Sequence, residues 1–394
     1  MSTSLFPKEK LHQYILSLRT ELDTLSEMYS EDRQKLENAL SKLEGELKGI
    51  VEFQHTGDLR IFAFSDYRVH DIRLLLDILD RLSEPIDIVV YAGDDVERFA
   101  PPRFDLVNLE ERGEFLLRKS SGTILIIRKP SLRQADENFF EKIAKKAKAG
   151  LIAVSGNDNP LGPAHIYGEK VYDVYRTWVK IGRFLFVGLE GAPYQSRSSL
   201  HSESAYAVRL ELAKKLLNEG EKFIIVSHVP PRGILDYAKR MGAEHIGSKA
   251  LRIFLEHNPN LTSLVICGHV HREGGKKEII GGTLVVNVAS HDFVGDRGVV
   301  AIITVNNRGK ARKVDFLNIP SPVEEVLKRR ISAKEKVKEL TRLGIDLETA
   351  KWLVDSFEKQ GDNFLEEISK YLWRIREFRH AKGKKDTDLT RFLT

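Results

Sequence analysis

Short runs rich in β-branched and aromatic residues recur between residues 59 and 317, and each run ends in a polar or glycine-containing turn. These runs predict strands at residues 59–65, 86–92, 151–155, 184–188, 223–227, 264–267, 283–288 and 299–305. Helices are predicted between several of them, at residues 71–82, 136–149, 206–218 and 248–257. Strands that alternate with helices indicate an α/β core. Residues 101–129 fit neither pattern, and no conformation is assigned to them.

Residue types that bind metal ions follow five of these strands in a fixed order. They are Asp66, Asp94 in Gly93-Asp94-Asp95, Asn157 in Gly156-Asn157-Asp158, His228, and the two histidines of Gly268-His269-Val270-His271. Each motif alone is weak evidence, because aspartate and Gly-Asn-Asp at a strand end are often only turn residues. Together they carry more weight, because the strand ends of an α/β sheet share one rim and converge on one ligand there.

The ordered set of motifs resembles the signature of the calcineurin-like metallophosphoesterases over roughly residues 59–317. Residues 227–233, 246–252 and 282–287 resemble the prokaryotic and archaeal Icc-type branch of that family. The resemblance implies an α/β fold, a four-layer α/β/β/α sandwich with two divalent metal ions at the rim between its sheets. It also implies hydrolysis of a phosphomonoester or phosphodiester by a metal-bound hydroxide. Manganese is the expected metal, with iron, zinc, nickel or cobalt as alternatives.

The resemblance also implies a role for each ligand candidate. Asp94 is expected to bridge the two metals, Asp66 and His271 to hold the first, and Asn157, His228 and His269 to hold the second. Asp158 stands where many relatives have a histidine that assists the leaving group, so the acid–base chemistry of this position departs from the family pattern.

A second departure lies at Arg68, where relatives have a ligand histidine. Arginine cannot bind a metal, because its guanidinium stays charged and offers only donors. The first metal site is therefore either weakened or completed by His70 as a substitute ligand. Since residues 71–76 read as the start of a helix, His70 is alternatively a cap-side residue that points away from the metals. Arg68 is a candidate clamp for the substrate phosphate, or a solvated or ion-paired side chain.

Helical segments flank the core on both sides. Leucines and other apolar residues spaced by three and four predict a helical hairpin or coiled coil over residues 1–52. This stripe packs either on the chain's own core or on a second copy, which would give a homo-oligomer through residues 10–50. After a core of residues 53–320, residues 321–394 are predicted to form a helical module with a basic tail, beginning with the cap signals of Ser321, Pro322 and Glu324.

Basic residues interleaved with aromatic ones are concentrated from residue 370 to the end of the chain. This composition is compatible with binding of nucleic acid or of another acidic partner. The spacing of the aromatics favours a helix face packed on the module. The overall excess of 62 Lys+Arg over 57 Asp+Glu is too small to favour nucleic acid by itself. No apolar run approaches the roughly 18 residues of a membrane span. With no leader-like segment at residues 1–10 and only one cysteine, the chain is expected to be cytoplasmic, with no membrane partner.

Two classes of function are compatible with these features. The leading hypothesis is a dinuclear metal-dependent phosphoesterase, favoured by the presence of six ligand candidates. The alternative is a metallophosphoesterase-like scaffold, catalytically weakened by Arg68 and Asp158, that acts as an interaction protein through its helical ends. A nuclease is a narrower third option, supported only by the basic tail.

Overall fold

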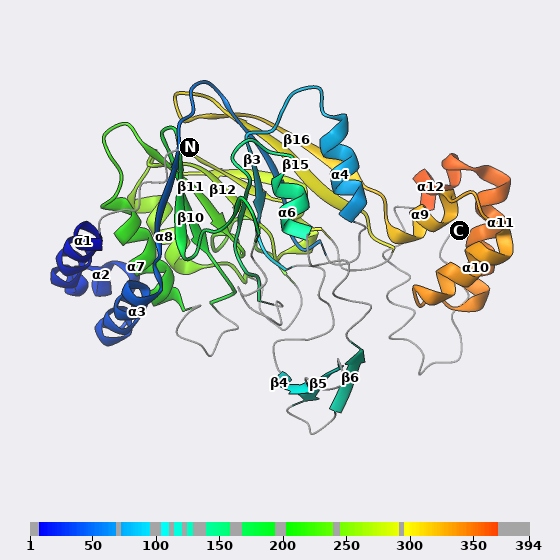
Figure 1. Ribbon diagram of the computed structural model, residues 1–394, viewed down its shortest axis with the longest axis horizontal. Coiled ribbons are helices and arrows are strands. Elements are labelled where there is room, and N and C mark those ends of the chain that lie inside the picture. The colour runs from blue at the N-terminus through cyan, green and yellow to red at the C-terminus, as the bar shows by residue number, and fades with distance from the viewer. Residues whose placement is uncertain are drawn as a thin grey trace. The chain divides into compact units, whose positions relative to one another are not determined.

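The computed structural model describes residues 8–67, 72–94, 104–109, 114–119, 124–128, 139–157, 168–193, 202–238, 245–290 and 295–368. The described residues form two compact units (Figure 1). The first contains the N-terminal helices and both large sheets up to Leu317, and the second contains residues 295–298 and the described residues from Asn318 onward.

A six-stranded sheet and a seven-stranded sheet make up the centre of the first unit. The order in the six-stranded sheet is β16 (Ala311–Ile319), β15 (Gly298–Val305), β2 (Leu59–Phe64), β3 (Ile88–Tyr91), β7 (Leu151–Ala153) and β8 (Val171–Asp173). The order in the seven-stranded sheet is β1 (Gly49–Phe53), β9 (Thr177–Ile181), β10 (Phe184–Leu189), β11 (Lys222–Ser227), β12 (Thr262–Cys267), β14 (Thr283–Asn287) and β13 (Lys276–Ile280). Strands β2, β3 and β7 run parallel, and so do β10, β11, β12 and β14.

Alternating side chains on these strands build two apolar layers, because successive residues of a strand point to opposite faces. Ile61 and Ala63 of β2 join Phe186 of β10 and Ile224 of β11 in one buried cluster between the two sheets. On the outer face of the six-stranded sheet, the ring of Tyr91 packs on Phe140 of helix α6 (Phe139–Ala144), beside helix α4 (Ile72–Arg81). With helices on both outer faces, the predicted four-layer α/β/β/α sandwich is confirmed.

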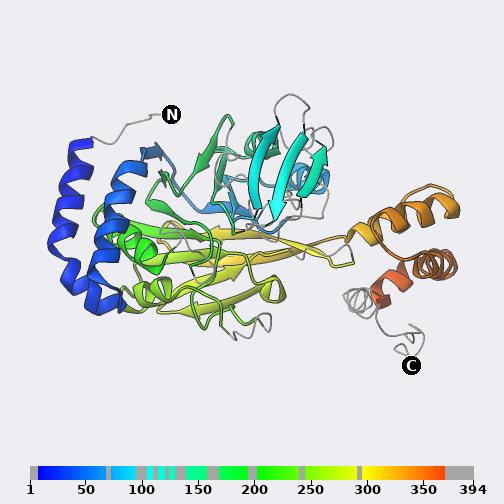
Figure 2. The same cartoon turned by 90° about the horizontal axis from the view of Figure 1, so that it is seen from below.

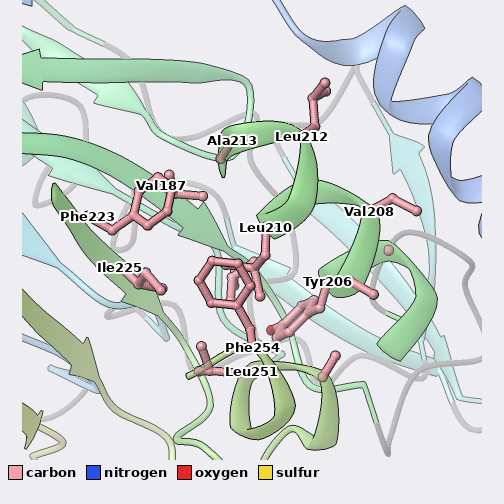
Figure 3. Packing of buried hydrophobic residues seen from close by; sticks show 14 of the residues in the cluster. Val187, Tyr206, Val208, Leu210, Leu212, Ala213, Phe223, Ile225, Leu251 and Phe254 are labelled. Atoms are coloured by element: carbon pink, nitrogen blue, oxygen red, sulfur yellow. The ribbon is translucent and has the colours of Figure 1, made fainter. Parts of the chain in front are cut away.

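The outer face of the seven-stranded sheet is covered by α7 (Glu203–Lys214) and α8 (Lys249–His257). Figure 3 shows side chains of both helices packed against Phe223 and Ile225 of β11. Helix α7 is buried over every residue from Ser204 to Ala213, so it lies inside the unit rather than on its surface. Its N-cap is Ser202, whose hydroxyl accepts from the Ala205 amide, and it therefore begins three residues before the predicted start at residue 206.

Helix α7 also packs against the N-terminal helices, which are α1 (Lys8–Thr20), α2 (Leu22–Tyr29) and α3 (Arg33–Glu46). Figure 2 shows α1 and α3 side by side. Their apolar stripe is buried in one cluster with α7, and its fully or nearly fully buried members include Ile15, Leu18, Leu22, Leu25, Leu36, Leu40 and Leu43. The stripe thus packs on the chain's own core. Self-association through residues 10–50 stays a prediction, and it would have to use other side chains.

Several strands were not anticipated. Residues 49–53 form β1 and pair in parallel with β9, so the end of the segment expected to be helical belongs to a sheet. Residues 101–129, to which the sequence assigned no conformation, contain three antiparallel strands: β4 (Phe104–Leu109), β5 (Glu114–Lys119) and β6 (Ile124–Arg128). Strands β8, β9, β13 and β16 were also missed, because each is paired with a strand distant in sequence or lies at a sheet edge.

The described part of the second unit is helical from residue 322 onward. Its helices are α9 (Pro322–Lys328), α10 (Ala333–Arg342), α11 (Leu347–Gln360) and α12 (Asp362–Ile368), packed around Leu327, Leu340, Leu353 and Leu365. The predicted cap of α9 is confirmed as a capping box, in which Ser321 and Glu324 exchange side-chain and backbone hydrogen bonds. Ser332 and Glu335 form a second capping box at α10. None of the helices in the described part of the chain combines the length and apolar character needed to cross a bilayer.

Candidate metal centre

The residues expected to bind metal all follow the carboxyl ends of central strands. Asp66 lies two residues after β2, Asp94 three after β3, Asn157 four after β7, His228 directly after β11, and His269 two after β12. The first three strands belong to one sheet and the last two to the other. Because the strands within each set run parallel, their carboxyl ends meet at one rim, and the sandwich brings the two rims together.

Three other candidate ligands converge on the Nε2 atom of His228. This nitrogen lies 2.8 Å from Asn157 Oδ1, 3.4 Å from Asp94 Oδ2 and 3.2 Å from His269 Nδ1. Potential ligand atoms of Asp94, His228 and His269 all lie within 4.8 Å of one another. Among the described residues, these three form a group that is spaced closely enough to hold a metal ion. The structure therefore brings together the four residues that the resemblance assigns to the second metal.

The tautomer of His228 makes this cluster suitable for a cation. Its Nδ1 lies 2.8 Å from the carbonyl oxygen of Ala92, which can only accept a hydrogen bond. In the neutral imidazole Nδ1 therefore carries the proton, and Nε2 presents a lone pair. Asn157 Oδ1 and Asp94 Oδ2 lie 2.8 and 3.4 Å from Nε2, and all three groups are electron-rich and repel one another. A proton or a metal cation between them relieves the repulsion.

Electrostatics in the cluster favour bound positive charge. Burial lowers the pKa of His228, but the charge and hydrogen bond of Asp94, with the charge of Asp66, outweigh burial and raise it above the usual value. Burial and the neighbouring His228 lower the pKa of His269 to about 3, so this imidazole stays neutral and keeps a lone pair for a ligand bond. Carboxylate oxygens, an amide oxygen and neutral imidazoles fit divalent metals such as manganese, iron, zinc, cobalt or nickel.

Asp66 and His271 form a second pair beside this cluster. Asp66 Oδ1 lies 3.1 Å from His271 Nε2, and its Oδ2 accepts hydrogen bonds from the Ser65 hydroxyl at 2.7 Å and from the His269 amide at 2.8 Å. Burial alone would raise the pKa of Asp66, but the hydrogen bond and charge of His271 and the charge of His228 lower it overall. Asp66 is therefore an ionised, oriented carboxylate, as a metal ligand must be.

Three of the candidate ligands have left-handed backbone conformations. The φ angles are 54° at Asp66, 58° at Asp94 and 65° at His269. Residues with a side chain seldom adopt positive φ, at a cost on the order of 1–3 kcal/mol each, and such residues concentrate at functional sites. Their occurrence at three converging strand ends indicates that these turns are shaped for the position of the side chains.

The glycines next to the ligands allow the loops to approach each other. A Cβ atom on Gly156 would lie 1.8 Å from Asp94 Oδ1, and one on Gly268 would lie 2.0 Å from Ser65 Oγ. Gly93 has a φ of 100°, and its Cβ would lie 2.7 Å from both the Gly156 amide and His228 Nδ1. The Gly-Asp, Gly-Asn and Gly-His pairs of the sequence thus have a steric reason.

Other predicted site residues lie outside the described residues. They are Arg68, His70 and Asp158, together with Asp95, and the basic tail from residue 370 also falls there. Sequence reasoning missed Ser65, whose single hydroxyl proton is shared between Asp66 Oδ2 at 2.7 Å and the carbonyl oxygen of Gly93 at 3.0 Å. Its place directly before the first ligand was a usable signal. The carbonyl of Ala92, which orients His228, left no signal because every residue type has one.

A family model and a curated relative match parts of this chain. The model of the calcineurin-like phosphoesterase family matches residues 53–273. An uncharacterized protein of Methanocaldococcus jannaschii is 32% identical over 121 residues, which are 29% of this chain and 52% of the relative. The chain thus spans about half the length of the curated relative that it matches.

Two solved structures show weak similarity. The 5'-nucleotidase precursor from Thermus thermophilus is 14% identical, with a TM-score of 0.36 over 73% of this chain and 58% of that one. The Thermus thermophilus sulfate thiohydrolase SoxB is 11% identical, with a TM-score of 0.33 over 73% and 60% of the two chains. These low TM-scores support no statement about activity. The family model, in contrast, covers more than half of the 394-residue chain, and the protein belongs to the calcineurin-like phosphoesterase family.

Proposed function

We propose that this chain is a metal-dependent phosphoesterase that hydrolyses a phosphomonoester or a phosphodiester. Two divalent cations are proposed as its cofactors, manganese first among them. The proposed ligands are Asp94 between the two cations, Asp66 and His271 at the first, and Asn157, His228 and His269 at the second. The observation that supports this most is the convergence of Asn157, Asp94 and His269 on His228 Nε2 at 2.8, 3.4 and 3.2 Å.

The chain's own groups prepare the site in three ways. The Ala92 carbonyl fixes the His228 tautomer and leaves Nε2 free for a ligand bond. Ser65 and the His269 amide orient the Asp66 carboxylate. Asn157 contributes a neutral oxygen, which limits the negative charge that an approaching phosphate meets. When bound, a pair of divalent cations neutralises the phosphate and lowers the pKa of water towards about 7.

Hydrolysis of chromogenic substrates tests the proposal. Metal-stripped protein should hydrolyse p-nitrophenyl phosphate or bis-p-nitrophenyl phosphate only after manganese is added, and His228→Ala should abolish turnover because it removes a ligand at the centre of the cluster. His257→Ala is the matched control, because this exposed histidine of α8 bonds to the carbonyl of Ile253 in its own helix. Turnover that persists in His228→Ala would refute the proposal.

The same assay separates the proposal from its alternative. A catalytically weakened scaffold would bind manganese and hydrolyse neither substrate, whereas a nuclease would cleave single-stranded or duplex oligonucleotides in preference to the small substrates. Arg68 as a phosphate clamp, His70 as a substitute ligand and Asp158 near the leaving group remain proposals. Binding of an acidic partner through the tail from residue 370 is likewise a proposal.

A further inference from the structure

Tyr206 of α7 is a fully buried tyrosine with a directed hydroxyl group. Its ring packs among apolar side chains of α7, α8 and the seven-stranded sheet, as Figure 3 shows. Its hydroxyl lies 3.0 Å from the carbonyl oxygen of Glu190 and 3.2 Å from that of Gly191, so it donates to the turn that follows β10. Packing alone would be served by phenylalanine, since a buried hydroxyl stabilises a protein only when it is hydrogen-bonded.

The hydroxyl of Tyr206 stays protonated at neutral pH. Burial raises the pKa of Tyr206 well above 10, and the nearby charges of Glu203 and Glu190 raise it further. A protonated phenol that faces two carbonyl oxygens can only be the donor, and the two oxygens share its single proton. In the link between α7 and residues 190–191, the tyrosine is therefore the donor and the backbone carbonyls are the acceptors.

Residues 189–191, whose backbone accepts from Tyr206, are hydrogen-bonded to the loops that carry two candidate ligands, His228 and Asn157. On one side, the amide of His228 donates to the carbonyl of Leu189 at 2.9 Å. On the other side, the amide of Gly191 donates to the carbonyl of Ser155 at 3.0 Å, two residues before Asn157. The short segment 189–191 thus ties the β11 end, which carries one ligand, to the β7 end, which carries the other.

Glu190 fixes this segment a second time through its side chain. Its two carboxylate oxygens each lie 3.2 Å from a guanidinium nitrogen of Arg176, in the turn between β8 and β9. This anchor is independent of Tyr206, because it holds the side chain and not the carbonyls. Loss of the Tyr206 hydroxyl should therefore loosen the segment without releasing it.

We propose that Tyr206 is a positioning residue for the half of the metal centre that contains Asn157 and His228. The role rests on the proposed function, because it matters only if those residues bind a cation. Their contact of 2.8 Å between Oδ1 and Nε2 is set by the two loops that segment 189–191 joins. Metal bonds tolerate deviations of only about 0.2 Å, so a small relaxation of either loop weakens the site.

Calorimetric titration of metal-stripped protein with manganese tests this role in Tyr206→Phe. The variant keeps the ring and loses one hydroxyl, and a net loss near 1 kcal/mol corresponds to about fivefold weaker manganese binding. Excess manganese should restore hydrolysis of p-nitrophenyl phosphate towards the wild-type rate.

Tyr29→Phe is the matched control. This tyrosine of α2 is also buried, and its hydroxyl donates to Glu211 of α7 at 2.7 Å, but the bond does not reach the ligand loops. Both variants should unfold at lower temperature than wild type when metal-free, and only Tyr206→Phe should bind manganese more weakly. Equal affinities in wild type and Tyr206→Phe, or equal weakening in both variants, would overturn the positioning role. A wild-type protein that binds no manganese would overturn the proposed function as well.

Discussion

Gly156→Ala should destroy the metal centre and leave the fold in place. A Cβ atom at this position would lie 1.8 Å from Asp94 Oδ1 and 2.5 Å from the Asp94 amide nitrogen. Ordinary contacts begin near 3.4 Å, so the carboxylate oxygen must retreat by about 1.6 Å, far beyond the 0.2 Å that a ligand bond tolerates. Because one of the two clashes is with backbone, rotation of the Asp94 side chain alone cannot relieve the strain.

The expected magnitudes separate function from stability. Overpacking of this kind costs about 1–3 kcal/mol of unfolding free energy, which a domain of this size tolerates. Displacement of a metal ligand should weaken manganese binding by more than about 100-fold, since even changes behind the ligands cost about 10–100-fold. The assays are calorimetric titration with manganese and urea unfolding of the metal-free protein.

A second glycine supplies the control for this experiment. Gly45 lies in helix α3, and a Cβ atom there would meet nothing within 4 Å. Gly45→Ala should leave manganese binding unchanged and stabilise the protein by about 0.5–1 kcal/mol, because alanine loses less backbone entropy in a helix. Wild-type manganese affinity in Gly156→Ala would show that Asp94 is not a ligand, or that its loop does not approach Gly156 so closely.

Two further predictions concern buried residues of the same unit. Burial raises the pKa of Glu190 to about 7 from an ordinary value of 4.5, against the opposing charges of Arg176 and Arg209. The folded state holds this proton more tightly, so the contribution to stability is complete below pH 4.5 and is lost, on the order of 3 kcal/mol, as the pH rises through 7. Glu190→Gln should therefore lose less stability than wild type between pH 4.5 and 8 in urea titrations, and parallel pH profiles would refute the shift. Leu40→Ala should lower the unfolding free energy by about 3 kcal/mol without changing the mass in light scattering, because this leucine is fully buried within one chain. A lower mass at unchanged stability would instead place the stripe on a second copy.

Much of the fold followed from local signals in the sequence. The strands β2, β3, β11 and β12 were predicted because each is a short apolar run with a polar residue at its end. These polar residues also indicated which rim of the sheets carries the candidate metal ligands. The capping box at Ser321 was predictable because it involves neighbours three residues apart. Cys267 lies in the predicted strand of residues 264–267, and it is buried there.

What the sequence left open depends on contacts between distant residues. Strand β1 pairs with β9, more than a hundred residues later, and nothing within Gly49–Phe53 identifies that partner. The leucine stripe of α1–α3 fits a second copy as well as the chain's own α7, because periodicity identifies an apolar face and not its partner. Tyr206 and Ala92 act on the site through backbone carbonyls, which residue identity does not encode.

The central claim is that Asp94, Asn157, His228 and His269 form a metal site. Its most direct test is the number of manganese ions that one metal-stripped chain binds, in wild type and in Asp94→Ala. The wild type should bind at least one ion tightly, with a second, weaker ion if Arg68 impairs the site of Asp66 and His271. Asp94→Ala should lose the tight ion, because it removes the carboxylate 3.4 Å from His228 Nε2. A wild-type chain that binds no manganese, or an Asp94→Ala chain that binds it as tightly as wild type, would contradict the claim.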